Sequence, residues 1–537
     1  MPKIPQEIQK NTVKKKSQRW KNVLKKQAKA FCLGTGLHGY KYVAQSHRSK
    51  IERIIWAIIV GTSLTCAGEL MRIAWQYNSA RPTVTVIEST HRGIWNYPFP
   101  AVTICNMNRV SLSRAREFSQ HLVLSDNMTA DFILSQMGLL NELLNPGIHD
   151  EDVQDNLTRL QSVFDDNNYS IQKVIEEVTQ NCSSLVLGCK WKGTWTNCSD
   201  LFVPSYSREG ACCSFNYLTT KDPRKQSTIE PYRVTACGYQ TGLTVFVNPD
   251  ANDYAATILG SYGVKLMVHY PYDFPDHNAE NKLVGLNSQM FVSISPEETY
   301  STEEVKSLSV KTRDCIFSEE KQIGDDYDIM LMNLTYEKYT YKNCLAACRA
   351  ATIKEKCQCI PYYYPQQGTR VCDLNDVKCL NEYKSWYETS WPGVVLTSET
   401  ISSMTDEKKK NYGKNRPCGC MPDCVLFRYP IESSVGMMDR SGESKAVPNG
   451  SMIHVFFSDL VSIQYRRHAN YNWRNVFASF GGLLGLFAGF SLMSGYELIY
   501  FFVIRVIADA CMKKKVEKTN NIEKLNFDSE TTKRRRF

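Results

Sequence analysis

The stretch of sequence that decides the fold is VFASFGGLLGLFAGFSLMSGYELIYFFVIRVIADA, residues 476–510. It is long enough to cross a bilayer and few charges interrupt it, Glu497 and Arg505 among them, so we expect a transmembrane helix. Small residues recur along it at helical spacing, and a face of small residues lets helix backbones approach closely in lipid. These small residues are Ala478, Gly481, Gly482, Gly485 and Gly489.

Polar residues follow this small face. Ser491, Ser494 and Glu497 come soon after Gly489. An ionisable group at membrane depth faces protein or water rather than lipid, so a close-packing face followed by polar groups suits a pore-lining helix. The alternative for Glu497 is a helix-packing carboxylate bonded to a serine or to the backbone. A break in the helix at residues 489–491 would let Glu497 also approach the pore axis.

A second apolar stretch, residues 51–77, lies closer to the N-terminus. Its uncharged core is short, so a buried helix of a soluble protein is an alternative. Trp56 and Trp75 are 19 residues apart, which is about 28 Å along a helix. That spacing fits two aromatic belts flanking a bilayer core of about 30 Å. We therefore expect a first membrane span here.

The segment between the two apolar stretches carries all seven N-x-S/T sequons and 17 of the 20 cysteines. Confinement of the sequons to one segment indicates that it enters the secretory lumen, where cysteines pair as disulfides. Zinc binding by the C-x-C pairs is an alternative that no nearby histidine supports. The expected glycosylation sites are Asn127, Asn156, Asn168, Asn181, Asn197, Asn333 and Asn449.

The net charge of +9 belongs to the two ends of the chain. Both tails are rich in lysine and arginine, which does not suggest a nucleic-acid-binding face but does mark the cytoplasmic side of membrane helices. We expect a multi-pass plasma-membrane protein with both termini cytoplasmic. Its parts are a tail (1–50), transmembrane helix 1 (51–77), an extracellular domain (78–472), transmembrane helix 2 (473–507) and a basic tail (508–537).

Strand-like alternation occurs at both ends of the segment between the spans, at residues 81–105 and 453–465. A strand following the first span and one preceding the second could pair, which would couple the extracellular domain to both helices. No nucleophile elbow, H-E-x-x-H or Walker loop occurs in the sequence, so we expect neither enzyme activity nor a bound metal or cofactor.

Five motifs occur in order along the chain. They are His38-Gly39, FPAVTICNMN (99–108), KCQCIPYYYP (356–365), CGCMPDC (418–424) and GGLLGLFAGFSLMSGYELIYF (481–501). Together they resemble the epithelial sodium channel/degenerin family, which includes the acid-sensing ion channels. The triplet Gly489-Phe490-Ser491 in the last motif, with the short termini, is most similar to the insect pickpocket branch.

The resemblance implies a membrane α+β fold with two transmembrane helices flanking a large, disulfide-rich extracellular domain. That domain would be hand-like, with palm, finger and thumb, and three subunits would assemble around one pore. The resemblance implies passive passage of cations, with sodium preferred, and block by amiloride. It also implies a homo- or heterotrimer with related subunits in the lipid bilayer. The alternative is a non-conducting or auxiliary subunit that needs other family members.

The resemblance assigns a role to individual residues. Gly489, Phe490 and Ser491 match the selectivity filter, while His38 and Gly39 match a re-entrant cytoplasmic loop that influences gating. Further pore or gate positions are Ala478, Ser479, Gly482, Gly485 and Glu497. Among them, Ala478 matches the position where bulky side chains hold such channels open, and Gly485 matches a residue implicated in amiloride block.

Disulfide pairing is also implied by the resemblance. The expected pairs are Cys105–Cys212, Cys189–Cys198, Cys315–Cys424, Cys344–Cys420, Cys348–Cys418, Cys357–Cys379 and Cys359–Cys372. Three extracellular cysteines remain, and we favour an extra bridge from Cys182 or Cys213 to Cys237. An odd remainder leaves at least one free thiol or a bond to another chain.

The chain departs from the acid-sensing members at two positions. Thr312 stands where those members have a tryptophan, and Ser479 stands where they have an aspartate. We therefore do not expect proton gating, and the activating stimulus stays open.

Overall fold

A computed structural model gives the fold. The structure describes residues 23–124, 128–148, 150–220, 230–257, 259–277, 279–320, 336–365, 368–389, 420–439, 449–470 and 473–508. The chain divides into two compact units. The terminal unit comprises Met1–Val84 and Ala469–Phe537, and the central unit comprises Thr85–His468.

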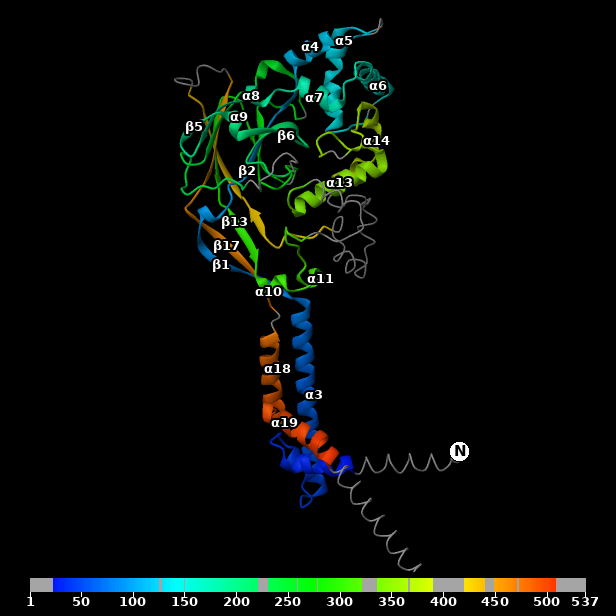
Figure 1. The fold of residues 1–537 in the computed structure, drawn as a ribbon, viewed down its shortest axis with the longest axis vertical. Coiled ribbons are helices and arrows are strands. Elements are labelled where there is room, and N and C mark those ends of the chain that lie inside the picture. The colour runs from blue at the N-terminus through cyan, green and yellow to red at the C-terminus, as the bar shows by residue number, and fades with distance from the viewer. Residues whose placement is uncertain are drawn as a thin grey trace, which may run out of the picture. The chain divides into compact units, whose positions relative to one another are not determined.

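The described part of the terminal unit is helical. It consists of a helix at residues 23–34, α2 (Tyr40–Ala44), α3 (Lys50–Ala80), α18 (Trp473–Ala488), α19 (Leu492–Ile499) and a π-helical turn, η7 (Tyr500–Ile504). Helices α3 and α18 lie side by side (Figure 1). Helix α3 is capped by Ser49, whose side chain accepts a hydrogen bond from the backbone nitrogen of Glu52, a favourable N-cap.

Helix α3 exposes its apolar side chains almost all round. Ile51 is 72% exposed and Ile58 is 60% exposed, an arrangement that water disfavours and lipid favours. By length and composition α3 could cross a membrane. Helices α18 and α19 pass the same test only when they are counted together as one bent span.

The described residues of the central unit form four sheets. In spatial order their strands are β1-β17-β13-β14, β11-β10-β2-β7-β6, β15-β12-β16-β8-β4-β5 and β3-β9. The strands are β1 (Thr83–Gly93), β2 (Ala101–Asn106), β3 (Asn108–Ser111), β4 (Val186–Trp191), β5 (Thr194–Thr196), β6 (Phe202–Ser207), β7 (Gly210–Phe215), β8 (Leu243–Val247), β9 (Tyr254–Thr257), β10 (Val264–His269), β11 (Glu280–Val284), β12 (Ser288–Ile294), β13 (Glu297–Ser301), β14 (Leu426–Arg428), β15 (Ile431–Met437), β16 (Ser451–Phe457) and β17 (Val461–Ala469).

The five-stranded and six-stranded sheets share one apolar core. Ile104 and Leu266 of the first sheet and Val245 and Val455 of the second are fully buried in one cluster. Strand β12 alternates buried and half-buried residues along its length, as a strand with one face on a core does. The core therefore holds the two sheets together as a sandwich.

Two consecutive pairs of parallel strands run through the central unit. Strand β12 pairs with β16, with Gln289 opposite Met452, and β13 pairs with β17, with Glu297 opposite Ile463. The offset grows by three residues between the two ladders, so residues 458–460 are accommodated as extra residues on one side only. Strand β17 also neighbours β1, which confirms that the strands at the two ends of the central segment pair.

Helices gather on one side of the central unit, where α4 to α7 lie near α13 and α14 (Figure 1). Their apolar faces and three consecutive tyrosines, Tyr362–Tyr364, form a second buried cluster. The helices are α4 (Leu112–His121), α5 (Ala130–Gln136), α6 (Glu151–Asp166), α7 (Ile171–Val178), α8 (Cys182–Leu185), α9 (Cys198–Leu201), α10 (Glu303–Lys306), α11 (Val310–Arg313), α13 (Tyr341–Cys357), α14 (Val377–Glu382) and α15 (Lys384–Glu388), with short 3-10 turns η1 (Ile94–Asn96), η2 (Met137–Leu143), η3 (Ala251–Asp253) and η4 (Leu374–Asp376).

Seven disulfides link the described residues, six of them pairs that the resemblance implied. They are Cys105–Cys212, Cys182–Cys213, Cys189–Cys198, Cys315–Cys424, Cys344–Cys420, Cys357–Cys379 and Cys359–Cys372. Cys348 is also disulfide-bonded, and its expected partner, Cys418, lies outside the described residues.

The expected bridge to Cys237 is wrong, because Cys182 pairs with Cys213 and Cys237 is a half-buried free thiol. Cys212 and Cys213 are neighbours on β7, and successive side chains of a strand point to opposite faces. Cys212 faces its cross-strand partner Cys105, whereas Cys213 faces the core beside α8, which begins at Cys182.

Candidate pore site at the broken helix

The second apolar helix is broken at residues 489–491. Helix α18 ends at Ala488, α19 begins at Leu492, and the two helices are bent by 75°. Gly489 has φ +67°, a left-handed conformation that glycine adopts at no steric cost. The break therefore falls on the triplet that the sequence marks, with glycine at the residue that turns.

A serine restarts the helix after the break. The Ser491 side chain accepts from the backbone nitrogen of Ser494 at 3.3 Å, and the backbone nitrogen of Ser491 donates to the Ser494 hydroxyl at 3.4 Å. This reciprocal arrangement is a capping box, which satisfies the backbone nitrogens left free at a helix start. The backbone on the far side of the break is therefore regular helix again.

The carbonyls that lose their helical partners at the break find partners elsewhere in the terminal unit. The backbone nitrogen of His38 donates to the carbonyl oxygen of Ala488 at 3.0 Å. The Ser63 hydroxyl, from the middle of α3, donates to the carbonyl oxygen of Phe487 at 2.5 Å. Irregular backbone is stable at membrane depth only when its polar groups are paired in this way or line a cavity.

The His38-Gly39 turn packs directly against the broken helix. A Cβ built on Gly489 would lie 2.6 Å from Cδ2 of His38, so the imidazole covers this glycine closely. Gly39 has φ +83°, and a Cβ there would lie 2.6 Å from a methyl carbon of Val60. Each position thus requires glycine for two reasons: the backbone is left-handed, and there is no space for a side chain.

The loop that carries His38 is fixed at its base by aromatic contacts. Phe31 contacts Phe502, Phe501 and Tyr40 at ring-centroid distances of 5.4, 5.8 and 6.5 Å, edge-to-face geometries that aromatic pairs prefer. A cavity of about 80 Å³ lies where the loop, α3 and the end of α18 meet, with His38 and Ser63 in its wall. Three segments far apart in sequence therefore converge at the break.

The other expected pore residues lie on α18 and α19. Ala478, Ser479 and Gly482 are exposed on α18, and a Cβ added at Gly482 would meet no described atom within 4 Å. The small face thus has open space beside it in the single chain. Glu497 lies on α19, where its Oε2 atom is buried and has no hydrogen-bond partner among the described residues.

Sequence reasoning missed Ser63 and Phe31. Ser63 is a hydroxyl residue in the middle of an apolar helix, which is the one signal that could have marked it. Phe31 gave no signal, because its role depends on the contacts with residues 501 and 502 that only folding creates.

The central unit contains buried charge pairs. The carboxylate of Glu209 lies 2.8 Å from Arg109 and 2.7 Å from Lys265. Burial alone would raise the pKa of Glu209, but hydrogen bonds from His277 and Lys265 with the nearby charge of Arg109 lower it to about 2. Asp423 behaves in the opposite way, because burial and the neighbouring Asp273 raise its pKa to about 7.

The expected glycosylation sites lie in the central unit. Asn168, Asn181 and Asn197 are exposed, while Asn156 and Asn449 are half-buried. Asn127 and Asn333 lie outside the described residues.

Known proteins are similar to this chain over most of its length. The profile of the family described as "Amiloride-sensitive sodium channel" matches residues 31–501. The chain is 25% identical over 493 residues to Sodium channel protein Nach of Drosophila ananassae, covering 90% of this chain and 87% of that protein. It is 23% identical to Pickpocket protein 28 of Drosophila melanogaster, over 87% of this chain and 77% of that protein.

A human relative matches over a similar span. The Bile acid-sensitive ion channel of Homo sapiens is 23% identical, over 88% of this chain and 84% of its own length. The family match runs from the helix before His38, through both apolar helices, to the segment after Glu497, so it includes His38, Ser63 and the break at residues 489–491. The chain therefore belongs to the amiloride-sensitive sodium channel family.

Proposed function

We propose that the chain is a subunit of an amiloride-sensitive, sodium-preferring cation channel of the plasma membrane. It assembles as a homo- or heterotrimer with related subunits, and its extracellular domain modulates the pore. The observation that carries this proposal is the break at Gly489–Ser491, which is closed on one side by the His38 loop.

The break supplies the chemistry that a cation filter needs. A permeating cation must exchange water for oxygen ligands, and a left-handed glycine followed by an exposed serine offers a carbonyl and a hydroxyl side by side. Three copies of residues 489–491 around an axis would form a ring of such oxygens. Glu497, with one buried carboxylate oxygen unpaired, is proposed to add negative charge to the inner vestibule.

The small face of α18 suits the convergence of three helices. Large side chains find no room where helices meet closely on an axis, and Ala478, Ser479, Gly482 and Gly485 keep this face of the helix thin. We place the gate at Ala478 and Ser479, near Gly482, and the amiloride contact at Gly485.

The membrane arrangement follows from the two apolar segments. We propose that α3 and the bent pair α18–α19 both cross the bilayer, with the central unit outside and both basic tails in the cytoplasm. Seven disulfides among the described residues and seven sequons in the sequence support the extracellular placement of the central unit.

Whole-cell recording from cells that express this chain tests the proposal. We expect an inward current that disappears when external sodium is replaced by an impermeant organic cation and that amiloride blocks. Gly485→Ala should weaken amiloride block without abolishing the current, because the added Cβ would meet only Phe490 O at 3.7 Å.

A chain that reaches the surface but stays silent would direct the test to co-expression with related subunits. Current that appears only then, and that changes when Ser491 is replaced in this chain, would assign it a place in a heteromeric pore. Current that never depends on this chain's residues 489–491 would overturn the proposal that it lines the pore.

A further inference from the structure

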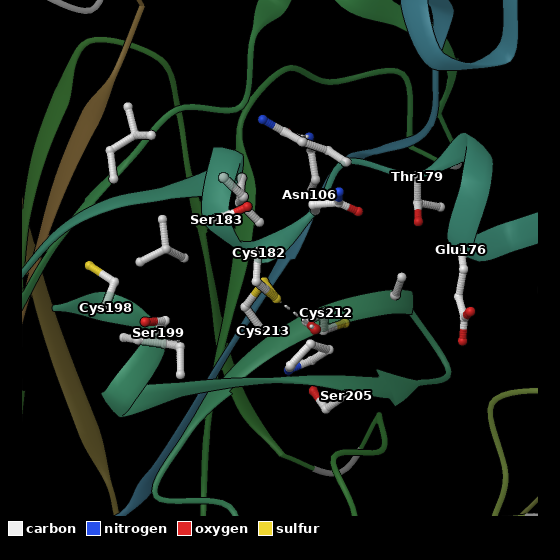
Figure 2. A pocket seen from close by; sticks show the side chains of 18 of the residues that line it. Asn106, Glu176, Thr179, Cys182, Ser183, Cys198, Ser199, Ser205, Cys212 and Cys213 are labelled. Carbon is white, nitrogen blue, oxygen red and sulfur yellow. Dashed lines mark hydrogen bonds between the residues drawn. A yellow bond between two sulfur atoms is a disulfide. The ribbon is translucent and has the colours of Figure 1, made fainter. Parts of the chain in front are cut away.

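The central unit contains an open cavity of about 1040 Å³, to which the proposed function assigns no role. Figure 2 shows the disulfide Cys182–Cys213 in this cavity, with Ser183 close by, Ser199 on one side and Glu176 on the other. Cavities that hold small molecules span about 300–1,000 Å³. The space is therefore large enough for an occupant of several rings.

Two glycosylation sequons open on this same cavity. Asn181-Cys182-Ser183 and Asn197-Cys198-Ser199 both contribute all three of their residues to its lining. Both asparagines are exposed, and both precede a short helix whose first residue is a disulfide cysteine. Of the sequon asparagines that the structure describes, these are the two that line the cavity.

The geometry at Asn197 leaves its glycan-bearing atom free. Its Oδ1 accepts a hydrogen bond from the backbone nitrogen of Ser199 at 3.4 Å, and no described residue bonds Nδ2, the atom to which a glycan joins. Two residues earlier, Trp195 is 57% exposed and also lines the cavity. A Cβ built on Gly188 would lie 3.4 Å from the Trp195 ring, so one edge of this ring rests on the strand beneath it.

We propose that this cavity is filled by the chain's own N-linked glycans on Asn181 and Asn197, with the first sugar on Asn197 stacked on Trp195. Each glycan joins by a new bond from Nδ2 to C1 of N-acetylglucosamine. The lipid-pyrophosphate carrier of the donor oligosaccharide leaves from C1, and the amide proton passes to solvent. The inference depends on the extracellular placement of the central unit.

The lining has the mixed chemistry that a sugar needs. A pyranose ring presents hydroxyls at its rim and C–H bonds on its faces, so it takes polar groups and an aromatic plane together. Glu176 and Ser183 are exposed at the cavity, and the Ser205 hydroxyl lies in its wall. Trp195 supplies the aromatic plane. Without a sugar stacked on it, this ring would leave a large apolar surface in water.

Glycopeptide mass spectrometry and enzymatic trimming of the full-length folded protein test the proposal. The chain is expressed in cells that make only high-mannose glycans, and occupancy is measured at Asn181, Asn197 and the exposed Asn168, which does not line the cavity. Endoglycosidase H, which cuts between the two core sugars, should release the Asn197 glycan about tenfold more slowly than the Asn168 glycan, because an aromatic contact must open first.

Substitution of tryptophan separates stacking from general crowding. Trp195→Ala should bring the release rate at Asn197 to that at Asn168, whereas Trp95→Ala, at another exposed tryptophan outside the cavity, should leave the difference intact. Occupancy at Asn168 with Asn181 and Asn197 unmodified would overturn the inference and leave the topology standing, as would equal release rates in the unmutated chain. No occupancy at any sequon would overturn the topology itself.

Discussion

The backbone nitrogen of His38 donates a hydrogen bond to the carbonyl oxygen of Ala488 across 3.0 Å. The N-terminal loop thereby holds the last carbonyl of α18, one residue before the helix breaks. A hydrogen bond of this kind contributes about 1 kcal/mol when water competes, and an unpaired carbonyl in its place costs more. Movement of the loop and rearrangement of the break are therefore coupled.

Gly489→Ala should remove most of the current. The new Cβ would lie 2.6 Å from His38 Cδ2, on a backbone with φ +67°, so either the His38 loop or the break must rearrange. The left-handed conformation alone costs a non-glycine residue about 1–2 kcal/mol, and we expect sodium current to fall about tenfold at unchanged surface expression. Gly495→Ala is the control, because its Cβ would meet only Phe490 Cζ at 3.7 Å.

Gly39→Ala should change gating more than Gly36→Ala. A Cβ at Gly39 would collide with Val60, and the backbone there has φ +83°. A Cβ at Gly36 would meet no described atom within 4 Å. The measurement is open probability in single-channel patches. Adding Val60→Ala to Gly39→Ala should recover part of the loss, since it relieves the collision but not the backbone strain. Equal effects of Gly39→Ala and Gly36→Ala would contradict this account.

Ala478→Val should enlarge the resting current. Ala478 is exposed in the single chain, so valine there does not disturb the packing within one subunit. In the proposed trimer any effect comes from crowding against neighbouring subunits, and crowding at a closed gate favours the open state. Whole-cell current before any stimulus measures this, with surface biotinylation as the control. A current that is unchanged or abolished at normal surface expression would count against a gate at this position.

Asp423→Asn should make thermal stability less dependent on pH. Burial and Asp273 raise the pKa of Asp423 to about 7, so the folded state takes up a proton that the unfolded state releases. The stability that this proton uptake provides is fully present below the ordinary aspartate pKa and is lost as pH rises toward 7. Asparagine still accepts from the backbone nitrogen of Tyr341, which lies 3.2 Å from both carboxylate oxygens.

The melting temperature of the detergent-solubilised chain, measured from about pH 4.5 to about pH 7.5, tests this prediction. We expect the variant to gain roughly 1–2 kcal/mol relative to the unmutated chain at the upper end of the range. Asp166→Asn, at an exposed carboxylate, should leave the pH profile unchanged. A parallel shift of the whole Asp423→Asn profile would contradict the expected loss of pH dependence.

Cys182→Ser and Cys237→Ser should differ sharply. The Cys182–Cys213 bridge spans 31 residues, and closing a loop of that size stabilises a fold by about 3–4 kcal/mol in the chain-entropy description. Cys237 is a free thiol, so serine there should change stability by no more than about 0.5 kcal/mol. Thermal unfolding of the oxidised proteins measures both, and a loss of stability in Cys237→Ser like that in Cys182→Ser would indicate that Cys237 has a disulfide partner.

The position of the helix break in the second apolar segment could largely be predicted from the sequence of that segment. A glycine followed by Ser491 and Ser494 contains both the turn and the helix cap that follows it, so the position of the break is encoded locally. The 75° bend could not be predicted, because its size depends on the partners of the carbonyls at 487 and 488. Those partners, Ser63 and His38, come from more than 400 residues away.

The pairing of cysteines shows the same limit. Cys105 and Cys212 are directly opposite on neighbouring strands, so a correct strand register is enough to place that bridge. Cys213 could be assigned only after the face of β7 that it occupies was known. An error of one residue in register would have exchanged the roles of Cys212 and Cys213.

The central unit's resistance to a pulling force depends on its two successive parallel ladders, β12 with β16 and β13 with β17. Strand β17 ends at Ala469, and a pull on that end can act along the strand axis. The bonds of both ladders cross that axis at regular intervals and are loaded together in shear, whereas a pull at right angles would peel them apart one after another. The same ladders are therefore stiff toward one direction of force and compliant toward the other.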